Sequence, residues 1–130
     1  MSSRACFGAV VYAKDPARVA TFYEHLVPMS VIHREPDHVI LESPVAQLVV
    51  HAIPRQIADS IEIASPPERR TETPIKLFFT VESLAGVRAG AAALGGELNA
   101  PEQEWEWLGC RICDGHDPEG NVVQFRERAR

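Results

Sequence analysis

The stretch IKLFFTVESLAGVRAGAAALGG, residues 75–96, decides the fold because the chain has already shown the same arrangement near its start. Residues 75–81 are an apolar run typical of a strand, and Ser83 is a typical N-cap for a helix. The next apolar side chains recur at helical spacing and form one stripe: Leu84, Val87, Ala91 and Leu94. Gly95-Gly96 supplies the C-terminal stop. The stretch therefore predicts a strand followed by a helix.

The first copy of this arrangement begins with residues 6–13, which predict a buried strand. Asp15 is a suitable N-cap, and Pro16 suits the first helical position because its missing N–H has no partner there anyway. The apolar stripe of this helix is Val19, Phe22, Tyr23 and Leu26. Pro28 ends the helix. An offset of 68 residues superimposes the two copies, which predicts an internal structural repeat.

Each copy continues with three further strands. In the first half they are expected at 30–34, 38–43 and 46–53. In the second half a short strand at 97–99 is followed by a loop with two tryptophans, and then by the hairpin strands 108–114 and 120–126. Both halves are therefore predicted to be β-α-β-β-β units.

The predicted fold class is α+β, with two tandem β-α-β-β-β modules inside a single domain of residues 1–130. Module 1 spans about 5–53 and module 2 about 75–127. The linker at 54–74 is polar and rich in proline.

Composition describes an ordinary globular domain, with 45% hydrophobic and 24% charged residues. The net charge of −5 argues against a nucleic-acid partner, and no segment has the ~20 consecutive apolar residues of a membrane span. The apolar run at 5–13 leads straight into charged residues, which argues against a signal peptide. Three cysteines do not form a disulfide framework. We therefore expect a cytoplasmic protein.

The stretch GCRICDGHDPEGNVVQF, residues 109–125, resembles half of a zinc site or a redox pair, because Cys110 and Cys113 precede His116. On an extended strand, however, side chains three positions apart project to opposite faces. DPEGN at 117–121 is typical of the turn of a hairpin. A shared zinc ion is therefore not expected here.

Together, the repeat and its motifs resemble the vicinal oxygen chelate superfamily, which groups glyoxalase I, bleomycin-resistance proteins, fosfomycin-resistance enzymes and extradiol dioxygenases. The matching features are Asp15, Phe22-Tyr23, the F-x-V-x-S-L pattern at 79–84, Gly95-Gly96 and DPEGN at 117–121. The resemblance implies a curved sheet that lines a cavity, with the helices on its outer face. It also implies a homodimer.

The resemblance places the family's metal ligands at Gly8, Val49, Lys76 and Gln124. A catalytic divalent site needs about three donors such as His, Glu or Asp. Glycine and valine offer none, and a lysine places an ammonium where the cation belongs. We therefore predict that the family's metal site is lost and that no cofactor is bound. A divalent metal is the alternative.

Strand alternation extends the concave face from these positions. It adds Val10, Tyr12, Gln47, His51, Phe78, Thr80, Val122 and Arg126. The opposite phase is uniformly apolar, as a helix-covered face must be: Phe7, Ala9, Val11, Leu48, Val50, Leu77, Phe79, Val81, Val123 and Phe125.

Several residues of this face are candidates for ligand binding or catalysis. His51 is a general base or a ligand contact, or else a rim histidine bonded to backbone. Lys76, in a predicted strand, either meets a carboxylate or contacts an anionic or carbonyl ligand. Arg126 contacts ligand or is a solvated strand end. The other histidines, His33, His38 and His116, are expected at the surface.

Trp105 and Trp107 are two positions apart, so on a strand both side chains would face the same way. Beside Glu102, Glu104 and Glu106 they predict an aromatic, acidic wall for a flat cationic ligand. The alternative is that they pack a strand edge or a dimer seam. The predicted ligand-binding set is Tyr12, Gln47, His51, Lys76, Phe78, Thr80, Trp105, Trp107, Gln124 and Arg126.

Two functions follow. The first is a metal-independent small-molecule-binding protein resembling the bleomycin-resistance branch, with a cationic or aromatic ligand. The second is a glyoxalase-like lyase, isomerase or hydrolase of a small oxo compound, with or without a divalent metal, that uses His51 and Lys76 as catalytic residues. An interaction domain with a vestigial cavity is a third possibility.

Overall fold

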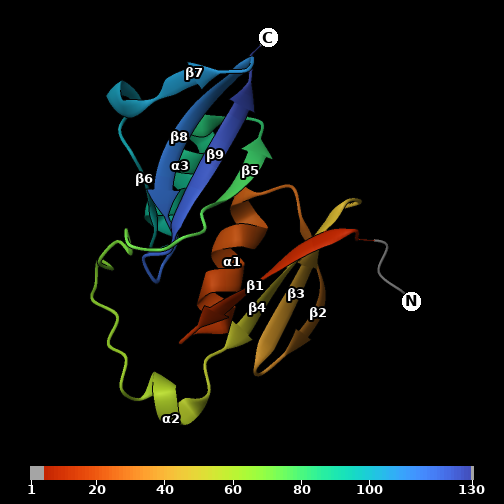
Figure 1. Cartoon of the computed structure of the whole chain (residues 1–130), viewed down its shortest axis with the longest axis vertical. Coiled ribbons are helices and arrows are strands. Elements are labelled where there is room, and N and C mark those ends of the chain that lie inside the picture. The colour runs from red at the N-terminus through yellow and green to blue at the C-terminus, as the bar shows by residue number, and fades with distance from the viewer. Residues whose placement is uncertain (1–4, 130) are drawn as a thin grey trace. The chain divides into compact units, whose positions relative to one another are not determined.

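The computed structural model describes residues 5–129, and its first five elements form the predicted first module (Figure 1). The elements are β1 (Phe7–Ala13), α1 (Pro16–Leu26), β2 (Ser30–Glu35), β3 (His38–Glu42) and β4 (Ala46–Ala52). The sheet has the strand order β1-β4-β3-β2, in which β1 runs parallel to β4 and the other pairs are antiparallel.

The second module repeats this topology and adds one strand. Its elements are β5 (Leu77–Val81), α3 (Leu84–Ala93), β6 (Glu97–Leu98), β8 (Cys110–His116) and β9 (Val122–Arg128). The order β5-β9-β8-β6, with β5 parallel to β9, matches the first sheet strand for strand. The segment predicted as a loop instead forms a 3-10 turn (Pro101–Gln103) and β7 (Trp105–Trp107), which pairs with β8.

The chain divides into two compact units. In the part of the chain that is described, one contains 5–24 together with Pro28–Glu62, and the other contains His25–Val27 together with 63–129. The linker holds the short helix α2 (Arg55–Ala58). Among the described residues, no helix is both long and apolar enough to cross a membrane.

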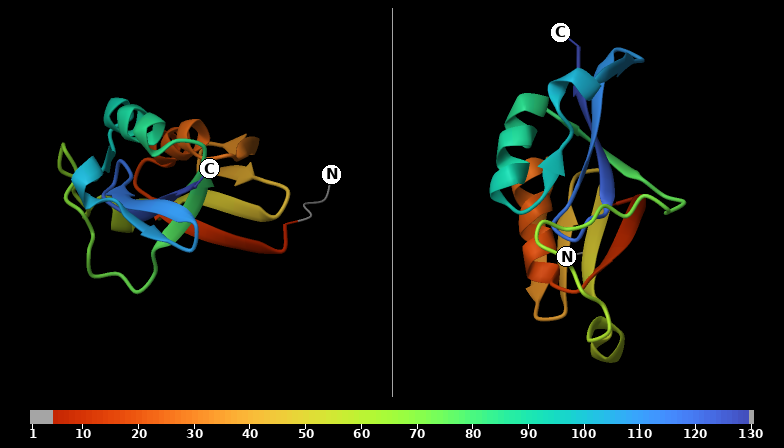
Figure 2. Two further views of the ribbon diagram at one scale, coloured as in Figure 1. Left: turned by 90° about the horizontal axis from the view of Figure 1, so that it is seen from above. Right: turned by 90° about the vertical axis from the view of Figure 1, so that its left-hand side faces the viewer.

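Both helices begin at the predicted caps. The Asp15 carboxylate accepts a hydrogen bond from the backbone N–H of Arg18 at 3.1 Å, and the Ser83 hydroxyl accepts one from that of Gly86 at 3.0 Å. Gly95 has φ of 88°, the left-handed conformation that ends a helix. In both views of Figure 2, α3 lies against one face of the second sheet.

Burial follows the predicted alternation of the strands. In β4, Leu48 and Val50 are at most 2% exposed, whereas the alternating residues Gln47, Val49 and His51 are only half-buried. The buried residues of the first unit include Val19, Phe22, Tyr23, Val39 and Leu41, and those of the second include Leu84, Val87, Leu98, Val123 and Phe125. Phe7 departs from the pattern because, as the first residue of β1, it is 71% exposed.

The DPEGN turn is a largely buried loop held by hydrogen bonds to Asp117. The Asp117 carboxylate accepts hydrogen bonds from the backbone N–H groups of Glu119 and Asn121, and Gly120 has φ of 84°. The preceding residue, His116, is 7% exposed and accepts a 2.9 Å hydrogen bond from Nε of Arg69 in the linker. The expectation of a surface histidine at this position is therefore wrong, because the linker returns over the turn.

Candidate functional site

The strand registers place the predicted site positions of the two modules in equivalent places. In the first sheet Val10 lies opposite Val49, and in the second sheet Phe78 lies opposite Gln124. Because the 68-residue offset superimposes Val10 on Phe78, Val49 and Gln124 occupy corresponding points of their sheets. By the same reasoning Tyr12 lies opposite His51, as Thr80 lies opposite Arg126.

In the second unit, four polar side chains form a continuous chain across the open face. Lys76 Nζ lies 2.9 Å from one carboxylate oxygen of Asp114, and Nε2 of Gln124 donates to the other oxygen at 3.2 Å. The amide oxygen of Gln124 accepts a 2.8 Å hydrogen bond from Nε of Arg126. Lys76 precedes β5 rather than lying inside it, and it meets a carboxylate, one of its two predicted partners. Sequence reasoning missed Asp114.

Arg126 also connects this chain to the aromatic side chains. Its guanidinium carbon lies 3.7 Å from the ring centroid of Phe78 and 5.7 Å from that of Trp107. Phe78 and Trp107 are 53% and 54% exposed, so both rings retain open surface. A guanidinium over aromatic faces is held by the ring quadrupoles. The structure therefore brings together Phe78, Trp107, Gln124 and Arg126.

The tryptophans face the same way, as predicted, but the glutamates between and before them do not join them. Trp105 lies opposite Ile112 of β8, and Ile112 lies opposite Arg126 of β9, so these side chains share one face of the sheet. Trp107 is two positions after Trp105 on the same strand and therefore lies on this face as well. Glu106 lies opposite Arg111 on the other face, and Glu104 bonds to Arg111 and to Arg88 of α3. The tryptophan wall is therefore not lined by Glu104 and Glu106, contrary to the sequence-based expectation.

Glu104 is part of a nearly buried ion-pair cluster on the α3 side of the sheet. Its side chain is 8% exposed. Burial raises the pKa of Glu104, but hydrogen bonds from Arg88 and Arg111 outweigh it and hold this pKa below its ordinary value. The cluster stabilises β7 and contributes no open charge to the tryptophan face.

In the first unit, His51 is held with one ring nitrogen free. Its Nδ1 lies 2.8 Å from the carbonyl oxygen of Ala52, and because a carbonyl only accepts, Nδ1 carries the proton. In this tautomer, Nε2 is the ring nitrogen that carries the lone pair. The ring contacts Tyr12 edge-on at 5.9 Å, whereas Gln47 is engaged by its neighbour Glu42 at 2.8 Å.

Two further histidines extend this row across the first sheet. The His38 ring stacks on His51 at 5.8 Å and 7°, and the His33 ring stacks on His38 at 5.3 Å and 30°. Nδ1 of His38 lies 2.7 Å from the carboxylate of Asp37, and this hydrogen bond lowers the pKa of Asp37. Sequence reasoning treated His33 and His38 as surface histidines. The turn at Ser43-Pro44 was a usable signal, since it sets the register in which His38 lies opposite His51.

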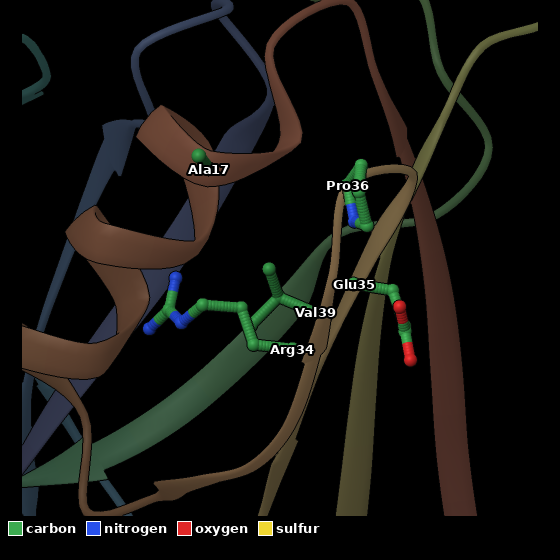
Figure 3. Close-up of a pocket in the computed structure, with 5 residues that line it drawn as sticks. All are labelled: Ala17, Arg34, Glu35, Pro36 and Val39. Carbon is green, nitrogen blue, oxygen red and sulfur yellow. The ribbon is translucent and has the colours of Figure 1, made fainter.

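The opposite face of this hairpin carries a cavity of about 350 Å³ (Figure 3). It is lined by Ala17, Arg34, Glu35, Pro36 and Val39. Figure 3 shows Arg34 and Val39 pointing toward α1, whereas Glu35 points away from the helix. The cavity therefore lies on the helix side of the sheet, apart from the histidine row.

The family's metal positions do not hold a suitable donor set. Gly8 and Val49 have no donor atom, and a Cβ added to Gly8 would lie 2.8 Å from the carbonyl oxygen of Gln47, closer than a Cβ is found to approach. The ammonium of Lys76 is paired with Asp114, and the Gln124 oxygen already accepts from Arg126. Residues at these four positions do not fit a catalytic divalent metal.

A family model described as glyoxalase-like domain matches residues 8–125. The chain belongs to this family. It is thereby a member of the vicinal oxygen chelate superfamily, and its two sheets have the glyoxalase/bleomycin-resistance fold. No curated protein matches this glyoxalase-like chain in sequence.

Solved structures support the fold of this glyoxalase-like chain over almost its whole length. A glyoxalase/bleomycin resistance protein/dioxygenase family enzyme from Burkholderia phytofirmans PsJN matches with a TM-score of 0.69 and 18% identity, covering 93% of this chain and 96% of that one. A glyoxalase/bleomycin resistance protein from Albidiferax ferrireducens T118 gives 0.66 and 16%, covering 94% and 96%. A bleomycin resistance determinant encoded on transposon Tn5 gives 0.57 and 18%, covering 93% and 95%.

Proposed function

We propose that this protein binds a planar aromatic small molecule and that it does so without a metal at the family's positions. The observation that carries the proposal is the Arg126 cluster, in which one guanidinium lies over Phe78 and near Trp107 while its Nε is fixed by Gln124. Such a cluster offers open aromatic surface and an oriented donor side by side. Binding of this kind needs no catalyst, so loss of the metal ligands costs it nothing.

The free end of Arg126 favours a ligand with an acceptor group. Within residues 5–129, no hydrogen bond or ion pair reaches the terminal nitrogens of Arg126. A carbonyl, carboxylate or phenolate next to an aromatic ring would accept from these nitrogens while the ring packs on Trp107. Of the two ligand characters suggested by the sequence, aromatic is the one that the contacts favour, because a cationic ligand would compete with Arg126 for Phe78.

The test is a thermal-shift and calorimetric screen of aromatic compounds that share a ring system and carry a carboxylate, a neutral carbonyl or an amine. A ligand at 100 times its Kd should add about 2.7 kcal/mol to the stability. Carboxylates and carbonyls are expected to bind more tightly than the amines. Phe78→Ala and Arg126→Gln should each weaken binding at least tenfold, whereas the control Arg55→Gln, on exposed α2, should not. Addition of a chelator should leave the affinity unchanged.

Two outcomes would overturn the proposal. One is a screen in which no aromatic compound stabilises the protein. The other is a ligand whose affinity is lost on chelation or is unaffected by both substitutions. The homodimer implied by the family resemblance is part of the same proposal, and light scattering coupled to size-exclusion chromatography should give a mass of twice 14.4 kDa.

A second candidate function, turnover of a small oxo compound by a glyoxalase-like lyase, isomerase or hydrolase, is favoured by the state of His51. Its Nδ1 proton is fixed on a backbone carbonyl, so Nε2 is set up to accept a proton from a bound substrate. Turnover of small aldehydes and ketones that His51→Gln abolishes, with folding unchanged, would establish it. Turnover that survives this substitution would exclude His51 as the base.

A further inference from the structure

Three residues outside the family's metal positions place their donor atoms together in the first unit. The carboxylate of Asp37 and ring nitrogens of His38 and His51 all lie within 4.8 Å of one another. We propose that these residues form a binding site for a late first-row transition-metal ion such as Zn²⁺, Ni²⁺ or Cu²⁺. Imidazole nitrogen with carboxylate oxygen is a donor set that suits these ions.

The fold sets this grouping through the hairpin registers. Asp37 lies in the turn between β2 and β3, directly before His38, and the antiparallel pairing of β3 with β4 puts His38 opposite His51. A tetrahedral zinc ion with bonds of about 2.0–2.1 Å needs its donors roughly 3.4 Å apart. Donor atoms at most 4.8 Å apart therefore have to approach one another by no more than about 1.4 Å, and all three side chains are at least partly exposed.

The orientation of His51 is an independent observation that points to a metal ion. Metal-binding histidines usually donate their second ring N–H to a carboxylate or backbone carbonyl, which fixes the tautomer and aims the other nitrogen at the ion. His51 is already in this state, because its Nδ1 donates to the carbonyl of Ala52 at 2.8 Å. Because Nδ1 is occupied in this way, Nε2 is the ring nitrogen of His51 that would bind the ion.

The surroundings of the cluster favour a cation. Nδ1 of His38 and the Asp37 carboxylate are hydrogen-bonded at 2.7 Å, and an ion bound between them would take the place of the bridging proton. His33 stacks on the other face of His38, and its Nε2 lies 3.4 Å from the carboxylate of Glu35. These two side chains supply a further imidazole and a second negative charge beside the three donors.

The site is distinct from the positions that the family resemblance assigns to metal. His51 lies two residues after Val49 in β4, a displacement of about 7 Å along the strand. The proposal is also independent of aromatic-ligand binding, because the Arg126 cluster is formed by other residues in the second unit. Failure of either proposal leaves the other standing.

The test is metal binding by tag-free protein that has been stripped with a chelator and then titrated calorimetrically with Zn²⁺, Ni²⁺ and Cu²⁺. We expect one ion per chain, and nitrogen hyperfine structure from at least two imidazoles in the Cu²⁺ electron paramagnetic resonance spectrum. His38→Gln and His51→Gln should each weaken binding at least tenfold, and Asp37→Asn should weaken it less. His25→Gln, in the last turn of α1, is the matched control and should bind as the wild type does.

Circular dichroism and thermal melting of each variant establish that a loss of metal is not a loss of fold. Retention of one tightly bound ion by the double variant His38→Gln/His51→Gln would overturn the proposal. Wild-type binding no tighter than millimolar for all three ions would overturn it equally, since scattered surface histidines would give that result.

Discussion

Restoring a carboxylate at position 124 should destabilise the protein without creating a metal site. Gln124 is 7% exposed and uses both ends of its amide, donating to Asp114 at 3.2 Å and accepting from Arg126 at 2.8 Å. In Gln124→Glu, the donor facing Asp114 becomes a second negatively charged oxygen. The family resemblance expects a metal-binding glutamate here, so this substitution asks whether one residue separates this chain from a metal-dependent relative.

The magnitude follows from the two distances. With an effective dielectric constant of 20, two like charges 3.2 Å apart repel by about 5 kcal/mol, and the new charge gains about 6 kcal/mol from Arg126 at 2.8 Å. These terms nearly cancel. What remains is the lost hydrogen bond to a carboxylate and the cost of burying a new charge, together about 2–3 kcal/mol. At roughly 4 °C per kcal/mol for a chain of this size, Tm should fall by about 10 °C.

The measurement is chemical denaturation and thermal melting of Gln124→Glu beside the volume-matched control Gln124→Met. The methionine variant loses both hydrogen bonds and adds no charge, so the difference between the two variants reports the new charge together with the Arg126 hydrogen bond that a glutamate keeps. Because Gly8 and Val49 supply no donor, the metal stoichiometry should remain that of the wild type. A Gln124→Glu variant that is as stable as the wild type, or that binds an additional ion, would refute the reasoning.

Three further predictions concern the second unit. Gly120→Ala should lower the free energy of unfolding in denaturant by at least 3 kcal/mol, because the new Cβ would lie 2.0 Å from a carbonyl oxygen of the linker. Gly109→Ala is the control: this glycine also has a positive φ but lies in open space, so its substitution should cost only about 1 kcal/mol. Burial, and then the charge of Arg69, lower the pKa of His116, so the folded state binds a proton at this residue less well than the unfolded state does. The stability of the protein should therefore fall as pH drops below about 6.5. In thermal melts from about pH 7.5 to 5, His116→Asn should flatten this pH dependence. Glu104→Gln should lower the free energy of unfolding by about 2 kcal/mol at pH 7. Because the pKa of Glu104 is depressed in the fold, the difference in stability between this variant and the wild type should shrink as pH falls below about 4.5. A difference that stays constant with pH would be inconsistent with the depressed pKa.

The repeat could be predicted from the sequence because the helix caps and the alternation of apolar residues in each module are local features of the chain. Asp15 and Ser83 act as caps where they were expected, and the alternation that made Leu48 and Val50 core residues was visible in the chain. Strand alternation alone could also have placed Glu104 and Glu106 on the face away from the tryptophans. That error came from treating neighbours in sequence as neighbours in space, although β7 was not foreseen as a strand.

The partners of the candidate residues could not be predicted in the same way. Asp114 meets Gln124 because β8 and β9 pair in register, and Lys76 reaches it from the position just before β5. A register is a property of the sheet rather than of any one segment. Arg69 reaches His116 because a proline-rich linker with no periodic pattern returns over a turn. Contacts of that kind depend on the whole fold.

The two modules carry different residues at equivalent positions of their sheets. Val49 lies opposite Val10 in the first sheet, and Gln124 lies opposite Phe78 in the second. Both Val49 and Gln124 are poor metal ligands. Two residues further along the same strand, on the same face, the first sheet carries His51 and the second carries Arg126. One is an imidazole beside His38 and the carboxylate of Asp37, and the other is a guanidinium over aromatic rings, so the two proposals invoke different kinds of recognition. An ion for the first and an aromatic acceptor for the second are the partners that these chemistries favour, and single substitutions at His51 and Arg126 should remove one without disturbing the other.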